Sequence, residues 1–105
     1  MIVRQPVRSG QVVYAEGTDL IVLAPVNPGA QLIADGNIHV YSTLRGRAVA
    51  GAKGYADARI FCMKLEAELI AVNGAYVTFD DIPADRRNRP VQVFVQNGAC
   101  VIAPL

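Results

Sequence analysis

The sequence predicts an all-β fold, a short β-solenoid of narrow triangular coils that ends in a C-terminal hairpin. The first observation is a repeat of short apolar segments broken by glycine, with a period of about 18–20 residues, as a solenoid requires. The second is composition, because Val and Ile supply 22 of the 105 residues and favour strands. The third is that no long segment repeats its apolar residues with the period of a helix.

The first two coils carry the clearest repeat. Residues 10–17 have Gly at each end and precede an apolar strand at residues 20–23. Nineteen residues further on, residues 29–36 show the same arrangement before a strand at residues 38–41. Glycine suits the corners of such coils, where the chain needs a positive φ or passes close to its neighbour.

The next two coils repeat more loosely. Gly46 lies 17 residues after Gly29 and opens a segment that leads to a strand at residues 60–63. Residues 69–74 then echo residues 32–36 at an offset of 37 residues, which is two periods. Small side chains in these segments fit the interior of a narrow coil; they are Ala15, Ala34, Ala48, Ala50 and Ala71.

Three Asx-Gly pairs support a competing interpretation, an antiparallel sandwich, because such pairs are strong hairpin signals. We expect a hairpin at residues 97–98, since residues 91–95 alternate and the chain returns as residues 99–102. At residues 35–36 and 73–74 the regular spacing favours passage to the next coil instead.

The remaining segments add little to the fold. Residues 80–90 predict a polar loop with at most one helical turn, and residues 63–69, the only helix candidate of any length, are too short to matter. No linker divides the chain, so residues 1–105 are predicted to form a single domain.

Charge and targeting signals narrow the class of protein. The net charge of +1 excludes the strongly basic footprint of a typical nucleic-acid binder. Only 18% of residues are charged, so we expect a partly apolar surface that a partner or a second copy covers. Residues 1–6 do not form a signal peptide and no segment is long and apolar enough to span a membrane, which points to the cytoplasm. There Cys62 and Cys100 are expected to be reduced core residues.

No catalytic, cofactor-binding or metal-binding residue is predicted, and we expect a protein that is not an enzyme. His39 is the only histidine, which leaves no usual catalytic triad and no His-rich metal site. It alternates with apolar neighbours, so we expect it on the outer face of a strand. The aspartates lie mostly beside Gly, Thr or Pro, where they usually make turn hydrogen bonds, and the glycines match no phosphate-binding loop.

Two groups of polar residues are candidates for binding. Four residues before the first coil combine a forked cation, a hydroxyl, a glycine and an amide: Arg8, Ser9, Gly10 and Gln11. Physical reasoning alone leaves two interpretations for them, a docking surface or, favoured, the polar cap that a solenoid end needs. The second group is Arg45-Gly46-Arg47 at a coil corner, where the arginines either bind a partner's carboxylates or are solvated surface. The arginines in the loop at residues 86–89 are interpreted as solvated.

Three stretches in this order resemble the C-terminal domain of the MinC family, bacterial inhibitors of division-septum placement. They are Arg-Ser-Gly-Gln at residues 8–11, Ala-Asp-Gly-Asn-Ile-His-Val-Tyr at residues 34–41 and Leu-Arg-Gly-Arg-Ala at residues 44–48. The resemblance covers residues 6–105 and weakens after residue 75. It implies a right-handed β-helix that dimerises through one apolar face.

The resemblance also implies partners. The family's domain binds the ATP-bound form of MinD, a membrane-associated ATPase, and its contact motif carries over to Arg8, Ser9, Gly10 and Gln11; we extend it to Arg47. We expect the family's N-terminal domain, which antagonises FtsZ, to be absent here. We therefore expect a cytoplasmic adaptor, recruited through MinD to the inner face of the membrane, that directs the division inhibitor so that FtsZ rings are blocked at wrong sites. FtsZ or other septal proteins are expected to bind mainly through the absent domain.

An alternative function is a structural β-solenoid that polymerises end to end without MinD. Polar termini argue against this alternative, since an open coil end should be apolar and strand-like.

Overall fold

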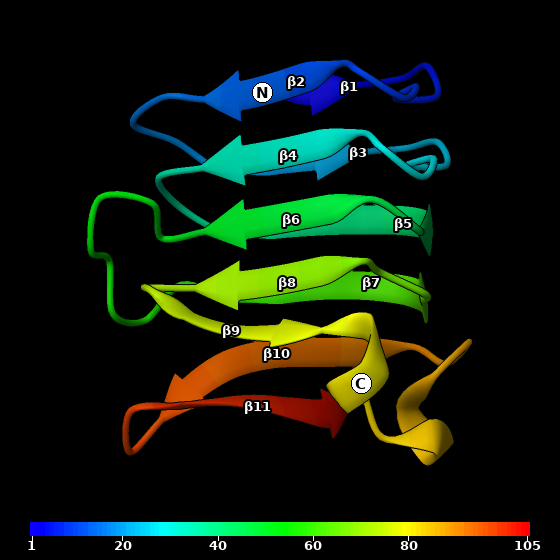
Figure 1. The fold of residues 1–105 in the computed structure, drawn as a ribbon. Helices are drawn as coiled ribbons and strands as arrows, with labels where there is room; N and C mark the ends of the chain where they lie inside the picture. The colour runs from blue at the N-terminus through cyan, green and yellow to red at the C-terminus, as the bar shows by residue number, and fades with distance from the viewer.

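Short strands stack as successive coils in the computed structural model, which describes residues 1–105 (Figure 1). The elements, in chain order, are β1 Ile2–Val3, β2 Val12–Ala15, β3 Leu20–Val22, β4 Gln31–Ala34, β5 Ile38–Leu44, β6 Arg47–Ala50, β7 Ile60–Leu65, β8 Leu69–Val72, β9 Ala75–Thr78, the 3-10 turns η1 Phe79–Asp81 and η2 Ala84–Arg86, β10 Val91–Gln96 and β11 Ala99–Pro104. No helix in the structure is long and apolar enough to cross a membrane.

The coils have three sides. One is a six-stranded sheet in the order β1-β3-β5-β7-β10-β11, and another is a five-stranded sheet in the order β2-β4-β6-β8-β9. Isolated parallel bridges from Val7 to Val26 and from Val26 to Leu44 form the third side. In Figure 1 the front strands run to the left and the back strands return to the right, each coil below the last, which makes the solenoid right-handed. The predicted fold class is confirmed.

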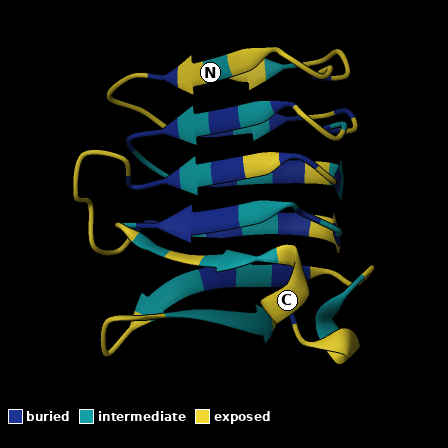
Figure 2. Ribbon diagram, viewed as in Figure 1, coloured by how far each residue is buried: buried dark blue, intermediate teal, exposed yellow.

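Residues on one face of β2 to β8 and of β10 fill the interior, whereas β1, β9 and β11 contain no buried residue (Figure 2). Leu32 pairs in register with Ala48, and both are fully buried; their neighbours Ile33 and Val49 point outward and are partly exposed. Four of the five alanines predicted to fill the coils are fully buried: Ala15, Ala34, Ala48 and Ala50. Ala71 is buried too, at 8% exposure, but it lies between two inward residues of β8 and is not part of the interior cluster.

The Asx-Gly pairs divide between corners and hairpins. Residues 35–36 lie at a coil corner between β4 and β5, and residues 97–98 join the antiparallel strands β10 and β11, as predicted. The expectation of a further coil at residues 73–74 is wrong, because β9 turns back antiparallel to β8. Asn73 and Gly74 have φ of 46° and 86°, the pair of positive values that a tight two-residue hairpin requires.

The C-terminal residues close that end of the solenoid. The polar loop contains η1 and η2, one more turn than predicted, and β10 pairs antiparallel with β7 rather than continuing the parallel coils. Ile82, Val91 and Val93 are buried there and complete the core. Residues 63–69 contain no helix, since β7 continues to Leu65.

Candidate functional site: a corner patch on the first coil

The four residues of the Arg-Ser-Gly-Gln stretch form a closed turn between the third side of the solenoid and β2. The Gln11 N–H donates to the Arg8 carbonyl at 2.9 Å, and the Arg8 N–H donates to Gln11 Oε1 at 2.7 Å. Gly10 has a φ of 85°, a left-handed conformation that glycine adopts without steric cost. Arg8, Ser9, Gly10 and Gln11 are all exposed. The turn therefore presents a cation, a hydroxyl and a bare stretch of backbone to solvent.

The turn rests on the equivalent corner of the second coil. The Gly10 N–H donates to the Gly29 carbonyl at 3.0 Å, and the Gln31 N–H donates to the Gln11 carbonyl at 2.9 Å. A Cβ at Gly29 would collide with Ser9 Oγ and lie 3.1 Å from Ser9 Cβ. The Ser9 side chain thus occupies the space that a side chain at Gly29 would need.

The stack of corners continues into the third and fourth coils. Gly46 is buried, and a Cβ there would collide with the Ala30 carbonyl and lie 2.8 Å from the Asn27 carbonyl oxygen. Glu68, at the fourth corner, reaches past Gly46, and its Oε1 accepts the Gly29 N–H at 2.7 Å. No pattern in the sequence marks Glu68 as functional, although Gly29 and Gly46 both mark corners in the repeat.

Arg47 shares a side of the solenoid with this turn. It begins β6, is exposed and pairs in register with Gln31, which pairs in turn with Val12 of β2. Two strand spacings put the Arg47 backbone about 10 Å from β2, within reach of one partner surface. Neither Arg8 nor Arg47 forms an ion pair within the chain. We call Arg8, Ser9, Gly10, Gln11 and Arg47 the corner patch.

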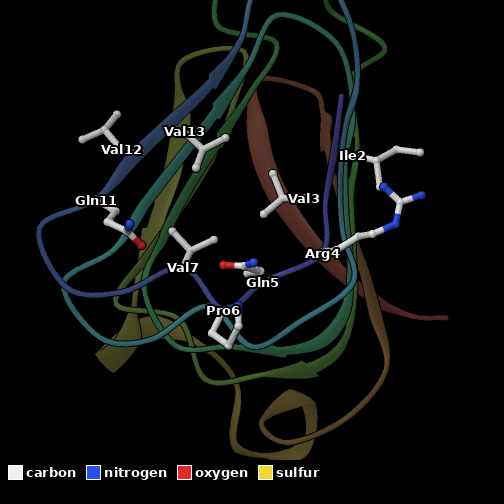
Figure 3. A pocket seen from close by; sticks show the side chains of 9 residues that line it. All are labelled: Ile2, Val3, Arg4, Gln5, Pro6, Val7, Gln11, Val12 and Val13. Atoms are coloured by element: carbon white, nitrogen blue, oxygen red, sulfur yellow. The ribbon is translucent and has the colours of Figure 1, made fainter.

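The N-terminal end of the solenoid is open beside the corner patch. A hollow of about 530 Å³ lies there, and Val3, Val7 and Val13 point into it while Ile2 and Val12 point outward (Figure 3). Arg4, Gln5 and Gln11 also line the hollow, so this end is partly polar, but the polar cap expected over it is incomplete. The Arg-Ser-Gly-Gln turn occupies one corner of the first coil and leaves the apolar interior of that coil in reach of solvent.

At another corner of the coils, Asp35 makes the turn hydrogen bonds predicted for aspartates. Its nearly buried carboxylate accepts the Tyr14 hydroxyl at 2.7 Å and the Gly17 N–H at 2.6 Å, and Lys53 Nζ lies 3.6 Å away. The hydrogen bond from Gly17 lowers the pKa of Asp35 below its usual 3.8. The Asp35 carboxylate raises the pKa of Tyr14 because it accepts the tyrosine's hydrogen bond. It also raises the pKa of Lys53 because its negative charge favours the ammonium form. This cluster holds the long loop after β6 to the second coil.

His39 projects from the outer face of β5, as predicted. Its ring stacks on Phe61 at 4.8 Å between centroids, and the Tyr41 hydroxyl lies 3.3 Å from Nδ1.

The arginine loop is less solvated than expected. Arg86 and Arg87 are partly buried, and the Arg87 guanidinium lies over the Phe79 ring at 4.5 Å.

Both cysteines are free thiols, as expected for reduced residues. Cys62 is buried, and burial raises its pKa to about 12; partial burial raises the pKa of Cys100 to about 11. No three His, Cys, Asp or Glu side chains come together in a way that would hold a metal ion.

Comparisons with known proteins agree on one family. Residues 1–105 match the family model described as "Septum formation inhibitor MinC, C-terminal domain". The "Probable septum site-determining protein MinC" of Xanthomonas campestris pv. campestris (strain B100) is 55% identical over 102 residues, 97% of this chain and 41% of the relative. The protein of the same name from Xylella fastidiosa (strain M12) is 56% identical over 99 residues, 94% of this chain and 42% of the relative.

A solved structure gives the same result at the level of fold. The "MinC:MinD cell division protein complex" of Aquifex aeolicus contains a chain that superposes with a TM-score of 0.88 and 30% identity, covering 100% of this chain and 85% of that chain. The chain spans about two-fifths of the length of the curated relatives named above. It belongs to the family of MinC C-terminal domains, from septum site-determining proteins of bacterial cell division.

Proposed function

We propose that this chain is a non-enzymatic adaptor that binds ATP-bound MinD through the corner patch. Through MinD it is brought from the cytoplasm to the inner face of the membrane, where it directs the division inhibitor so that FtsZ rings do not assemble at wrong sites. FtsZ itself is contacted mainly by the family's N-terminal domain.

The observation that carries the proposal is the geometry of the corner patch. The turn at residues 8–11 is fixed by its own hydrogen bonds, so little order has to be gained on binding. Arg8 and Arg47 are both exposed and free of ion pairs, and arginine forks match carboxylates on a partner. The similarity to a chain solved in a MinC:MinD complex supports MinD as that partner.

Homodimerisation is the second part of the proposal, because two corner patches on one dimer bind a MinD-covered membrane with avidity. Each sheet carries a largely apolar column of residues on its outer face. The five-stranded sheet carries one outward column across its strands: Tyr14, Ile33, Val49, Ala71 and Tyr76. The six-stranded sheet carries Ile21, His39 and Phe61 in register on its outer face. Sedimentation equilibrium of Ile33→Asp and Phe61→Asp, one from each sheet, identifies the face that packs on the second copy.

Co-sedimentation with MinD on lipid vesicles tests the adaptor function. We expect the wild-type chain to pellet with MinD in ATP and to stay in the supernatant in ADP. Arg8→Ala and Gly10→Asp are expected to lose ATP-dependent pelleting while remaining dimeric. Arg4→Ala is the matched control, since Arg4 is an exposed arginine of the same coil outside the corner patch. Pelleting that persists in both patch variants contradicts the assignment of this surface.

The open N-terminal end favours one alternative, a structural solenoid that polymerises end to end. Its hollow is lined by apolar residues together with Arg4, Gln5 and Gln11, and β1 and β2 are each paired on one side only. The opposite end is covered by the β10–β11 hairpin and the 3-10 turns, so it offers no matching open coil (Figure 1). Concentration-dependent fibres of the chain without MinD, seen by sedimentation velocity and electron microscopy, would favour this alternative over the adaptor.

A further inference from the structure

We propose that Glu68 is a positioning residue for the corner patch, acting from the fourth coil through Gly29 on the turn that carries Ser9 and Gly10. The inference rests on the proposed function, because the turn matters only if it is a binding surface. Glu68 does not itself belong to the patch.

The contact skips one coil. The Glu68 N–H donates to the carbonyl of Gly46 in the adjacent third coil at 2.9 Å. The Glu68 carboxylate, however, accepts the N–H of Gly29, which belongs to the second coil. Gly46 has no side chain, and a Cβ on it would collide with the Ala30 carbonyl of the second coil. Because Gly46 leaves no side chain at the third corner, Glu68 of the fourth corner can contact Gly29 of the second corner.

The Glu68 carboxylate accepts its hydrogen bond from a backbone N–H and not from a cationic side chain. Its neighbour Glu66 pairs with Arg45 Nε at 2.7 Å, whereas Glu68 forms no ion pair. A carboxylate that accepts a backbone N–H forms a charge-assisted hydrogen bond, about twice as strong as a neutral one. This bond fixes the position of Gly29 at an exposed corner that would otherwise hydrogen-bond to water.

Fixing Gly29 fixes the turn above it. The Gly29 carbonyl accepts the Gly10 N–H at 3.0 Å, and the Gly29 Cα faces the Ser9 side chain closely enough that a Cβ would collide with Ser9 Oγ. A shift of Gly29 by a few tenths of an ångström therefore moves both residues. The Glu68 carboxylate, Gly29 and the Ser9–Gly10 backbone form one continuous chain of contacts.

Three variants of the intact chain test the role of Glu68. Glu68→Ala removes the acceptor, Glu68→Gln keeps an acceptor oxygen at the same reach without the charge, and Glu66→Ala is the matched control for loss of a carboxylate from the same corner. Each is measured in two ways: amide hydrogen exchange of Gly29 and Gly10 in the free chain, and affinity for ATP-bound MinD. Thermal unfolding confirms that each variant is folded.

In Glu68→Ala we expect Gly29 exchange about tenfold faster and MinD affinity about tenfold weaker, as for loss of one hydrogen bond to a charged group. Glu68→Gln keeps a neutral hydrogen bond and should show about threefold changes in both measurements, whereas Glu66→Ala should show neither effect. Unchanged Gly29 exchange in Glu68→Ala overturns the inference, as does unchanged MinD affinity while Arg8→Ala abolishes binding. A wild-type chain that does not bind MinD overturns the proposed function, and the role of Glu68 with it.

Discussion

Replacing Gly29 with Ala adds one methyl group at the contact between the first two coil corners. Gly29 has a φ of 81°, which costs an Ala residue about 1–2 kcal/mol, partly offset by about 0.5 kcal/mol because Ala restricts the unfolded chain. The new Cβ also collides with Ser9 Oγ, and turning Ser9 off its rotamer costs about 1 kcal/mol more. We expect a total loss of about 2 kcal/mol, which lowers the Tm by about 10 °C.

The matched control is Gly17→Ala, because Gly17 has a similar φ of 70° but open space where its Cβ would be. It should lose only the backbone part, about 1 kcal/mol or about 5 °C in Tm. Differential scanning calorimetry measures both losses, and titration with ATP-bound MinD measures binding. We expect Gly29→Ala to bind at least about tenfold more weakly, because Ser9 is displaced, and Gly17→Ala to bind as wild type. Equal Tm losses in the two variants, or wild-type binding by Gly29→Ala, would contradict this prediction.

Three further predictions concern stability and reactivity. Leu32→Ala, at a fully buried position, should lose about 3 kcal/mol in urea unfolding, since it leaves a cavity in the second coil. Because the folded pKa of Asp35 is below 3.8, its stabilisation is present above that pH and is lost as pH falls through the folded value. Asp35→Asn should therefore show a smaller drop in Tm than wild type between pH 5 and pH 2, although its Tm is lower at pH 7. Cys62, with a pKa of about 12, should resist maleimide at pH 7.5 until the chain is unfolded, and rapid native labelling would contradict the burial.

The coil repeat could be predicted from the sequence because its cause is local. Short apolar strands and corner glycines recur at every coil, so residues 10–17 and 29–36 carry the same signal twice. The contacts between corners could not be predicted in this way. Glu68 and Gly29 lie 39 residues apart and meet only because the coils stack in a particular register.

The hairpin at residues 73–74 shows a different limit of sequence reasoning. Asp35-Gly36 and Asn73-Gly74 look alike along the chain, yet only the second pair has positive φ at both residues. Gly36 is required for another reason, since a Cβ on it would collide with Asp19 Oδ1 of the preceding coil. An Asx-Gly pair looks the same in the sequence whether its glycine allows the close approach of two coils or forms a hairpin. The spacing between coils does not distinguish the two cases.

In a solenoid, each coil contacts only the coils next to it. The effect of a substitution should therefore become weaker with each coil that separates it from the corner patch. The bond from Glu68 to Gly29 bypasses the third coil at Gly46, so the corner patch depends directly on the fourth coil. Gly46→Ala and Ser42→Ala both alter the third coil, but only the first adds a side chain against the second corner. If the bypass operates, Gly46→Ala weakens MinD binding and speeds Gly29 exchange, while Ser42→Ala, at a partly exposed position of β5, changes neither.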